Sequence, residues 1–190
     1  MILSYVDSSW DAIYNKMSED LNAIKWWFSN NKLVLSVEKT TFINFSLRKS
    51  IQYKENVLYK CDNCSLNNRY CHECAVIKRS TSTKYLGIIL DSELNWKAHI
   101  LKLKHKLISN IRLFYFLKKM CPKQILRTLY YALINSKLEY GVVLWGGTYV
   151  TNLKVLINAQ KLFVRLILGR NRFSSSHLCF VELNILPLRS

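Results

Sequence analysis

Apolar residues recur every three or four positions near the start of the chain, and this spacing predicts an amphipathic helix. The stripe consists of Trp10, Ile13, Met17, Leu21, Ile24 and Phe28. Ser8 or Ser9 can cap the start of this helix, and Asn30–Asn31 can end it. The apolar runs 33–37 and 42–45 follow, separated by Glu-Lys-Thr-Thr, and they predict two short strands joined by a tight turn.

The remaining pattern changes from strand-like to helical. The run 84–90 (Lys-Tyr-Leu-Gly-Ile-Ile-Leu) predicts a strand that ends at Asp91. Helical spacing then predicts a helix from about Trp96 to Lys119, with an apolar stripe made of Ile100, Leu103, Leu107, Ile111 and Phe114. Pro122 suits the first turn of a second helix. A third helix is predicted over about 152–168, with Gly169 as its C-cap.

These elements predict an α+β fold with its strands early in the chain. Residues 1–46 hold a helix and short antiparallel strands, residues 47–91 hold strands and four cysteines, and residues 92–190 are mostly helical. The chain has 190 residues, of which 50% are hydrophobic. This is enough to build a core and excludes a disordered basic tail.

The charge of the chain is concentrated in its second half. Lys and Arg number 28 against 12 Asp and Glu, a formal net charge of +16. Residues 97–190 alone hold 16 basic and 2 acidic residues, a net charge of +14. Such a field favours a polyanionic partner, with nucleic acid first and an anionic membrane surface second.

The predicted helix over 96–119 is the best candidate for binding nucleic acid, because its cations can neutralise phosphates. These cations, with the two that follow the helical stripe, are Lys97, Lys102, Lys104, Lys106, Arg112, Lys118 and Lys119. An ordinary solvated helix face is the alternative. Phe114, Tyr115 and Phe116 could stack on bases or could belong to the core.

Several classes of enzyme are excluded because their motifs are missing. The chain has no P-loop, no Gly-x-Gly-x-x-Gly and no Gly-x-Ser-x-Gly. Glu19–Asp20 is the only adjacent acidic pair, and neighbours on a helix point about 100° apart. The chain also has no secretory signal pattern and no apolar stretch long enough for a membrane span, so we expect an intracellular protein, in the nucleus or the cytoplasm.

Four cysteines in the middle segment form the sharpest local motif. Cys61, Cys64, Cys71 and Cys74 are spaced C-x2-C-x6-C-x2-C, which offers four thiolates to a tetrahedral Zn²⁺ ion. His72 is a substitute ligand. The six-residue gap is short for a zinc ribbon, so a hairpin with four thiols or a degenerate remnant site is the alternative.

Three stretches of the chain carry a resemblance to a known family. They are DLNAIKWWFSNNKLVLSVEKTTFINF (20–45), KYLGIILDSELNWKAHI (84–100), and LINSKLEYGVVLWGG (133–147) with LINAQKLFVRLILG (156–169). In this order they resemble the C-terminal part of the reverse transcriptase of non-LTR (LINE-type, jockey-like) retrotransposons. The resemblance covers nearly the whole chain.

The resemblance implies a role for each part. Residues 1–46 would be the end of the polymerase palm, where Lys39 would act as a leaving-group acid in an intact enzyme. Tyr85, Leu86 and Gly87 match the primer-grip turn. Residues from 92 onward match the thumb and its connection, which hold the RNA/DNA template–primer duplex. Mg²⁺ would be the cofactor of an intact parent polymerase only.

The chain also departs from this family. Its aromatic-x-Asp-Asp box is absent, because Tyr5-Val6-Asp7-Ser8 has Ser8 in place of the second acid and Trp10 already begins the helix. The earlier motifs with the other metal-binding Asp are absent as well. The resemblance therefore implies a fragment of an RNA-directed DNA polymerase, truncated at both ends, which binds template–primer and has no catalytic residues of its own.

Two alternatives to this reading stay open. The chain could be a small basic zinc-containing module that binds nucleic acid, or an inert pseudogene product with an exposed apolar palm face. That face would include Trp26, Trp27, Phe28 and Phe45. It could also dock a second chain that completes the palm.

Overall fold

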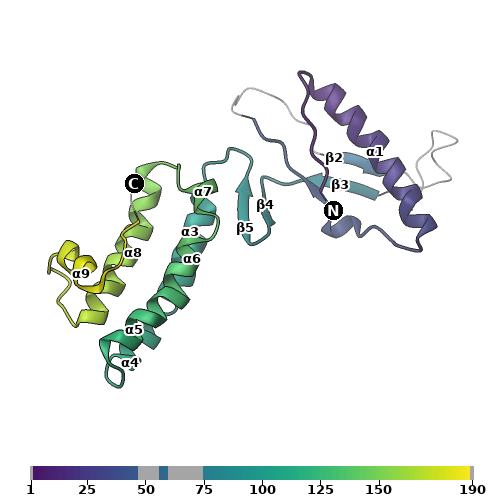
Figure 1. The fold of residues 1–190 in the computed structure, drawn as a ribbon. Helices are drawn as coiled ribbons and strands as arrows, with labels where there is room; N and C mark the ends of the chain where they lie inside the picture. The colour runs from purple at the N-terminus through teal and green to yellow at the C-terminus, as the bar shows by residue number, and fades with distance from the viewer. Residues whose placement is uncertain (1, 47–55, 60–74, 189–190) are drawn as a thin grey trace. The chain divides into compact units, whose positions relative to one another are not determined.

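The computed structural model describes residues 2–46, 56–59 and 75–188 (Figure 1). It divides into two compact units, Met1–Thr83 (unit 1) and Lys84–Ser190 (unit 2), which are described separately below. The described residues form helices and two small sheets in all, so the predicted α+β class is confirmed. The three-part division of the sequence at 46 and 91 stays a prediction.

Unit 1 packs one helix against a three-stranded sheet. Helix α1 (Trp10–Asn30) has the predicted bounds. The sheet has the order β1 (Thr41–Phe42), β3 (Ala75–Arg79), β2 (Asn56–Tyr59); β1 is parallel to β3 and β2 is antiparallel to it. The core between helix and sheet consists of Tyr14, Leu21, Val57 and Ile77, with Trp10, Met17, Val37 and Phe42 packed against it.

The hairpin predicted over residues 33–45 is wrong. Residues 33–36 form no strand, and a short 3₁₀ helix, η1 (Val37–Lys39), takes the place of the expected tight turn. The strand β1 pairs in parallel with β3, more than thirty residues further along the chain, with Thr41 opposite Lys78. Pairing with this distant strand determines the structure here, although the local apolar pattern predicted a hairpin. Val34 is left almost fully exposed.

A β-hairpin, whose first strand contains the boundary between the units, forms where the sequence predicted one continuous strand. Strand β4 (Ser82–Tyr85) turns at Leu86 and Gly87 into strand β5 (Ile88–Asp91). Both turn residues have positive φ, at 46° and 86°, as a type I′ turn requires. Leucine rarely adopts a positive φ, so Leu86 does not by itself indicate a turn in the sequence.

Helices form the rest of unit 2. The predicted helix over 96–119 is divided into α3 (Lys97–Ile108) and α4 (Ile111–Leu117). Next come α5 (Lys123–Tyr130), a π-helical turn η2 (Tyr131–Asn135), α6 (Ser136–Glu139) and α7 (Val142–Trp145). The long helix α8 (Val150–Leu168) ends as predicted at Gly169, which has φ +70°, and α9 (Ser176–Leu183) was not predicted.

Helix α8 lies at the centre of unit 2 and packs against α3, α4, α5 and α9. Its apolar face is buried along most of its length, and Phe163 on that face meets the Phe114 ring of α4 edge to face at 5.1 Å. These contacts hold the surfaces of α3 and α8 in fixed positions relative to each other. Within the described parts of the chain, no helix has both the length and the apolar character that crossing a bilayer requires.

Candidate nucleic-acid interface

Helix α3 presents a row of cations to solvent. Lys97, Lys102 and Lys106 are exposed, as is His105, and Lys104 is half-buried. The opposite face of the helix is buried through Ile100, Leu103 and Leu107. The apolar stripe predicted from the sequence therefore faces the core, and the lysines face away from it.

The other three predicted cations lie just beyond α3. Arg112 is exposed on α4, and Lys118 and Lys119 are exposed directly after this helix. All seven predicted residues thus belong to the α3–α4 segment of unit 2 and are solvent-accessible. None of them forms an ion pair within the described part of unit 2.

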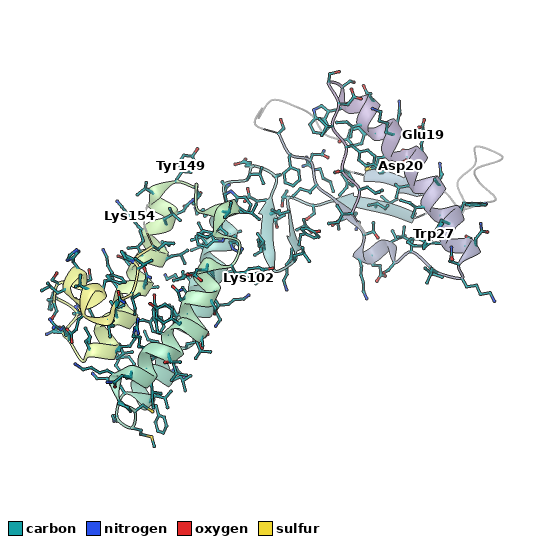
Figure 2. The ribbon with its side chains drawn as sticks, in the orientation of Figure 1. Glu19, Asp20, Trp27, Lys102, Tyr149 and Lys154 are labelled. Atoms are coloured by element: carbon teal, nitrogen blue, oxygen red, sulfur yellow. The ribbon has the colours of Figure 1, made fainter. Side chains whose placement is uncertain are left out.

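A second basic stripe, on α8, escaped the sequence analysis. Lys154, Asn158, Lys161 and Arg165 follow one another at steps of four, three and four residues, which places them on one helix face. Figure 2 labels Lys154 on α8 and Lys102 on α3. Arg165 is fixed by a hydrogen bond from Nε to the Ser174 carbonyl oxygen, at 2.9 Å. The spacing itself was the signal that could have revealed this stripe.

Few acidic groups oppose the positive charge of unit 2. Residues 84–190 hold 17 basic and 4 acidic residues, a net charge of +13. Across residues 84–188, the ion pairs all involve Glu182, which binds Lys123 at 3.5 Å and Arg170 at 2.6 Å. The lysines of α3 and α8 are therefore free to neutralise an external anion.

The predicted primer-grip residues form the tip of the β4–β5 hairpin. Tyr85 and Leu86 are exposed there. The Tyr140 hydroxyl donates a hydrogen bond to the Leu86 carbonyl oxygen. A side chain at Gly87 would lie against the Tyr140 ring, 3.5 Å from its Cε1 atom. The second and third family-like stretches thus meet at this turn.

A buried tryptophan holds Tyr140 and the hairpin in place. The Trp145 side chain is 0% exposed, and its Nε1–H donates to the Tyr140 carbonyl oxygen at 3.1 Å. Between them, Gly141 adopts φ +66°, and a Cβ atom there would come within 2.6 Å of Ile88 Cδ1. A larger residue at Gly141 would be strained by the positive φ and would have to displace the end of the Ile88 side chain, so glycine allows this close approach of β5 to the start of α7.

Asp91 organises the loop between the hairpin and α3. Its carboxylate accepts hydrogen bonds from the backbone N–H groups of Glu93, Asn95 and Trp96, at 3.2, 3.0 and 2.9 Å. The Asn95 carbonyl oxygen in turn accepts bonds from Thr148 Oγ1 at 2.9 Å and Asn152 Nδ2 at 3.2 Å. The start of the basic helix α3 is thereby tied to the start of α8.

His99 connects α3 to the hairpin as a neutral imidazole. Its Nδ1 atom accepts a hydrogen bond from the Ile89 backbone N–H at 3.3 Å, and its ring lies 6.0 Å from that of Trp145. Burial, followed by the positive charges of Lys106 and Lys102, lowers the pKa of His99 below its usual 6.5. Protonation would place a hydrogen on the nitrogen that now accepts the bond.

This arrangement predicts a loss of stability on acidification. The unfolded chain binds a proton at His99 at higher pH than unit 2 does, so stability is expected to fall as pH drops through about 6.5. Asparagine offers an acceptor that does not titrate. In thermal melts between about pH 7.5 and pH 5.5, H99N should lose less Tm than the wild type. H105N, at an exposed histidine on the same helix, should behave as the wild type does; an equal loss in H99N would contradict the role of His99.

Lys39 and the adjacent acidic pair Glu19–Asp20 lie on different elements of unit 1. Lys39 is exposed at the end of η1, and Glu19 and Asp20 are exposed on α1 (Figure 2). A hydrogen bond from Lys16 Nζ to Asp7 Oδ2 at 2.8 Å lowers the pKa of Asp7 to about 2, helped by the backbone N–H groups of Ser8 and Ser9. Asp7 is thus engaged in a local ion pair.

No group of three or more His, Cys, Asp or Glu side chains that could hold a metal ion occurs among residues 2–46, 56–59 and 75–188. The predicted zinc ligands Cys61, Cys64, Cys71 and Cys74 lie outside these described residues, as does His72. The zinc site therefore stays a prediction. The two remaining cysteines, Cys121 and Cys179, are free thiols, half-buried and buried respectively.

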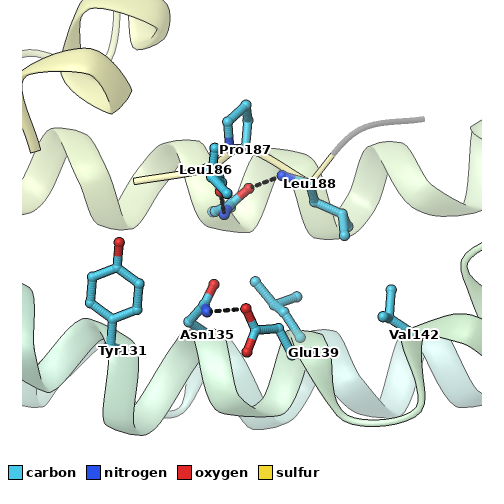
Figure 3. Close-up of a pocket in the computed structure, with 9 residues that line it drawn as sticks. Tyr131, Asn135, Glu139, Val142, Leu186, Pro187 and Leu188 are labelled. Carbon is cyan, nitrogen blue, oxygen red and sulfur yellow. Dashed lines mark hydrogen bonds between the residues drawn. The ribbon is translucent and has the colours of Figure 1, made fainter. Parts of the chain in front are cut away.

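A pocket of about 200 Å³ lies in unit 2 between the η2–α7 segment and the last described residues (Figure 3). Its lining consists of Tyr131, Asn135, Leu138, Glu139, Val142, Gln160, Leu186, Pro187 and Leu188. The Glu139 carboxylate, the single acid in this lining, accepts a hydrogen bond from Asn135 Nδ2 at 2.7 Å. The other titratable group of the lining, Tyr131, donates its hydroxyl to the Asn184 carbonyl oxygen at 2.9 Å, so the lining places no second carboxylate, histidine or cysteine beside Glu139 for acid–base catalysis.

Gln160 joins the C-terminal segment to the core beside this pocket. Its side chain is fully buried, and Nε2 donates to the Tyr130 hydroxyl at 2.7 Å and to the Leu186 carbonyl oxygen at 3.0 Å. Its Oε1 accepts from the Leu188 backbone N–H at 2.8 Å. The site is structural, because every bond of the amide ends on the chain itself.

Comparisons with known proteins give no match, whether with family models, curated proteins or solved structures. The resemblance to retrotransposon reverse transcriptases therefore rests on the quoted residues alone.

Proposed function

We propose that unit 2 binds the sugar–phosphate backbone of an RNA/DNA template–primer duplex, in the manner of the reverse transcriptase thumb that its sequence resembles. In this proposal the chain is a binding part of an RNA-directed DNA polymerase of the non-LTR retrotransposon type. It is not a polymerase by itself, because its sequence lacks the aromatic-x-Asp-Asp box that holds the catalytic Mg²⁺ ions.

The observation that carries this proposal is the row of exposed lysines on α3. Lys97, Lys102 and Lys106 face away from the core and have no acidic partner in the described part of unit 2. Binding gains free energy when unpaired cations on a rigid helix displace the counterions that are condensed on the phosphates. The stripe on α8 supports the same conclusion, since it adds Lys154 and Lys161 on a helix that packs directly against α3.

The hairpin tip supports a second part of the proposal. Tyr85 and Leu86 are exposed, while Tyr140 holds the turn from behind through the Leu86 carbonyl oxygen. A turn that is both exposed and rigid is suited to position a primer strand. We propose that this tip contacts the primer, as the primer grip does in the family that the sequence resembles.

Salt dependence tests the proposal most directly. The affinity of the full chain for a fluorescent RNA·DNA hybrid of about 20 base pairs should fall linearly with salt on logarithmic axes, by about 0.9 per phosphate contact. Replacing Lys102 and Lys106 together with glutamine should reduce the slope by about 1–2. Fluorescence anisotropy at several KCl concentrations measures this slope.

The matched control is K32Q/K78Q, which removes the same charge from exposed positions of unit 1. It should leave the slope nearly unchanged. An affinity that does not vary with salt, or an equal effect of both double variants, would refute the assignment to α3. With Mg²⁺ and nucleotides present, the primer of this hybrid should not be extended, and incorporation by the pure chain would show that it is a polymerase after all.

A further inference from the structure

Three consecutive aromatic residues on α4 point in different directions. Phe114 is 1% exposed and packs against Phe163, while Tyr115 is 55% exposed and Phe116 is 62% exposed. The sequence left open whether these rings belong to the core or to a surface. The structure assigns one ring to the core and leaves the other two in solvent.

The two exposed rings have a cation on each side in the sequence. Arg112 lies on α4, three and four positions before Tyr115 and Phe116, and Lys119 lies four and three positions after them, in the turn that follows the helix. At these spacings Arg112 is a neighbour of both rings on the helix surface. We call this group, Arg112, Tyr115, Phe116 and Lys119, the α4 patch.

No negative charge lies near the α4 patch in the sequence. Between Glu93 and Glu139 the chain holds no acidic residue at all. Across space, Glu182 is already bound to Lys123 and Arg170. The patch therefore complements an anion that also offers apolar or aromatic surface.

Exposed π-faces beside cations match the chemistry of unpaired nucleotides. Aromatic side chains stack on bases that are not already stacked in a duplex, and nearby Lys or Arg residues bind the phosphates between them. A duplex offers its backbone and the edges of its bases but no free base face, because its bases are stacked on one another. An unpaired strand is thus the ligand that uses every group of the patch.

An anionic membrane surface is the competing ligand, but α4 is poorly built for it. Interfacial helices bury a broad apolar face in the lipid. Here Phe114 is committed to the core, and Leu117 is half-buried against it. Within residues 111–120, Leu113 and Met120 are the other exposed apolar residues. The patch has two cations for two rings, which favours nucleic acid.

We propose that the α4 patch binds a single-stranded segment of nucleic acid, with Tyr115 and Phe116 stacked on successive bases and Arg112 and Lys119 on the adjoining phosphates. This inference rests on the proposed function, since the single strand would continue from the duplex held by the lysines of unit 2. It adds a preference for bases to an interface otherwise built for phosphates.

An abasic strand tests the proposal, because it has the phosphates of oligo(dT) and no bases. The full chain should bind oligo(dT) of about 20 nucleotides at least tenfold more tightly than an abasic strand of equal length, as expected for about two stacked bases. Y115A/F116A should reduce this ratio to below about twofold, without changing affinity for the abasic strand. Y115L/F116L, which keeps apolar bulk and removes the π-faces, should do the same.

Y149A is the control, because Tyr149 is 74% exposed, more than either ring of the patch, and lies at the start of α8 (Figure 2). It should keep the full preference for oligo(dT). Circular dichroism melts should show that each variant still folds, because the buried Phe114 is unchanged in all of them.

Three results would overturn the proposal. Equal affinity of the wild type for both strands, with salt-dependent binding of the hybrid intact, would remove base stacking and leave the proposed function standing. Loss of salt-dependent binding to every nucleic acid would remove both. If Y115A/F116A reduced binding to phosphatidylserine vesicles and not to oligo(dT), the patch would be a membrane contact.

Discussion

Replacing Trp145 with alanine is expected to lower the free energy of unfolding of unit 2 by about 3–5 kcal/mol. The indole is fully buried in the core of unit 2, so its removal leaves a large cavity. The substitution also removes the hydrogen bond from Nε1 to the Tyr140 carbonyl oxygen. Tyr140 supports the turn at Leu86, so the hairpin tip should loosen together with the core.

Urea unfolding followed by far-UV circular dichroism measures this loss, and hydrogen exchange at residues 82–91 measures the release of the hairpin. The matched control is Trp27→Ala, because Trp27 lies on α1 and is half exposed (Figure 2). An exposed helix position tolerates alanine, so this variant should change stability by no more than about 0.5 kcal/mol. A similar small effect of Trp145→Ala would show that the hairpin does not depend on this ring.

Replacing Gln160 with leucine is expected to cost about 2–4 kcal/mol, although the new side chain has a similar size. Three groups lose their partner at once: the Tyr130 hydroxyl, the Leu186 carbonyl oxygen and the Leu188 N–H. Tyr130 is affected most, because it is fully buried, and this burial raises the pKa of its hydroxyl to about 12. Once Gln160 is removed, the buried Tyr130 hydroxyl cannot replace the lost hydrogen bond with one to water.

Chemical denaturation measures the cost, and limited digestion with chymotrypsin reports on the C-terminal segment. Cleavage near Leu186 should become faster, because Gln160 binds the backbone on both sides of Pro187. Gln124→Leu makes the same change at an exposed position of α5 and should leave both measurements within error of the wild type. Unchanged cleavage in the Gln160 variant would show that other contacts hold this segment.

Helices could be predicted from the sequence where an apolar stripe or an end residue marks them locally. The stripe from Trp10 to Phe28 gave α1 almost to the residue, and Gly169 marked the end of α8. The pairing of β1 could not be predicted, because its partner β3 is brought to it by the tertiary fold. The apolar pattern of residues 84–90 predicted a continuous strand, and only the family resemblance placed a turn at Tyr85–Gly87; Leu86 has a positive φ there and accepts a hydrogen bond from Tyr140, more than fifty residues away.

The candidate interface was predictable in part. Its cations on α3 follow from charge and spacing, and the same reasoning applied to Lys154, Lys161 and Arg165 would have found the stripe on α8. The sorting of the α4 rings was predictable in part. The apolar stripe over 96–119 placed Phe114 on the core face, where it contacts Phe163, but the spacing did not decide whether Tyr115 and Phe116 belong to the core or to the surface.

The π-helical turn η2 has a geometric consequence for the sequence around it. The buried residues Leu126, Tyr130, Ile134 and Leu138 follow one another at intervals of four. In an α-helix, each such interval overshoots a full turn by about 40°, so three intervals would rotate the last residue about 120° away from the first. A π turn holds more residues, advances less per residue and takes back part of this rotation. A strict four-residue repeat therefore stays on one side of the helix here, and the repeat is itself a signal for the wider turn.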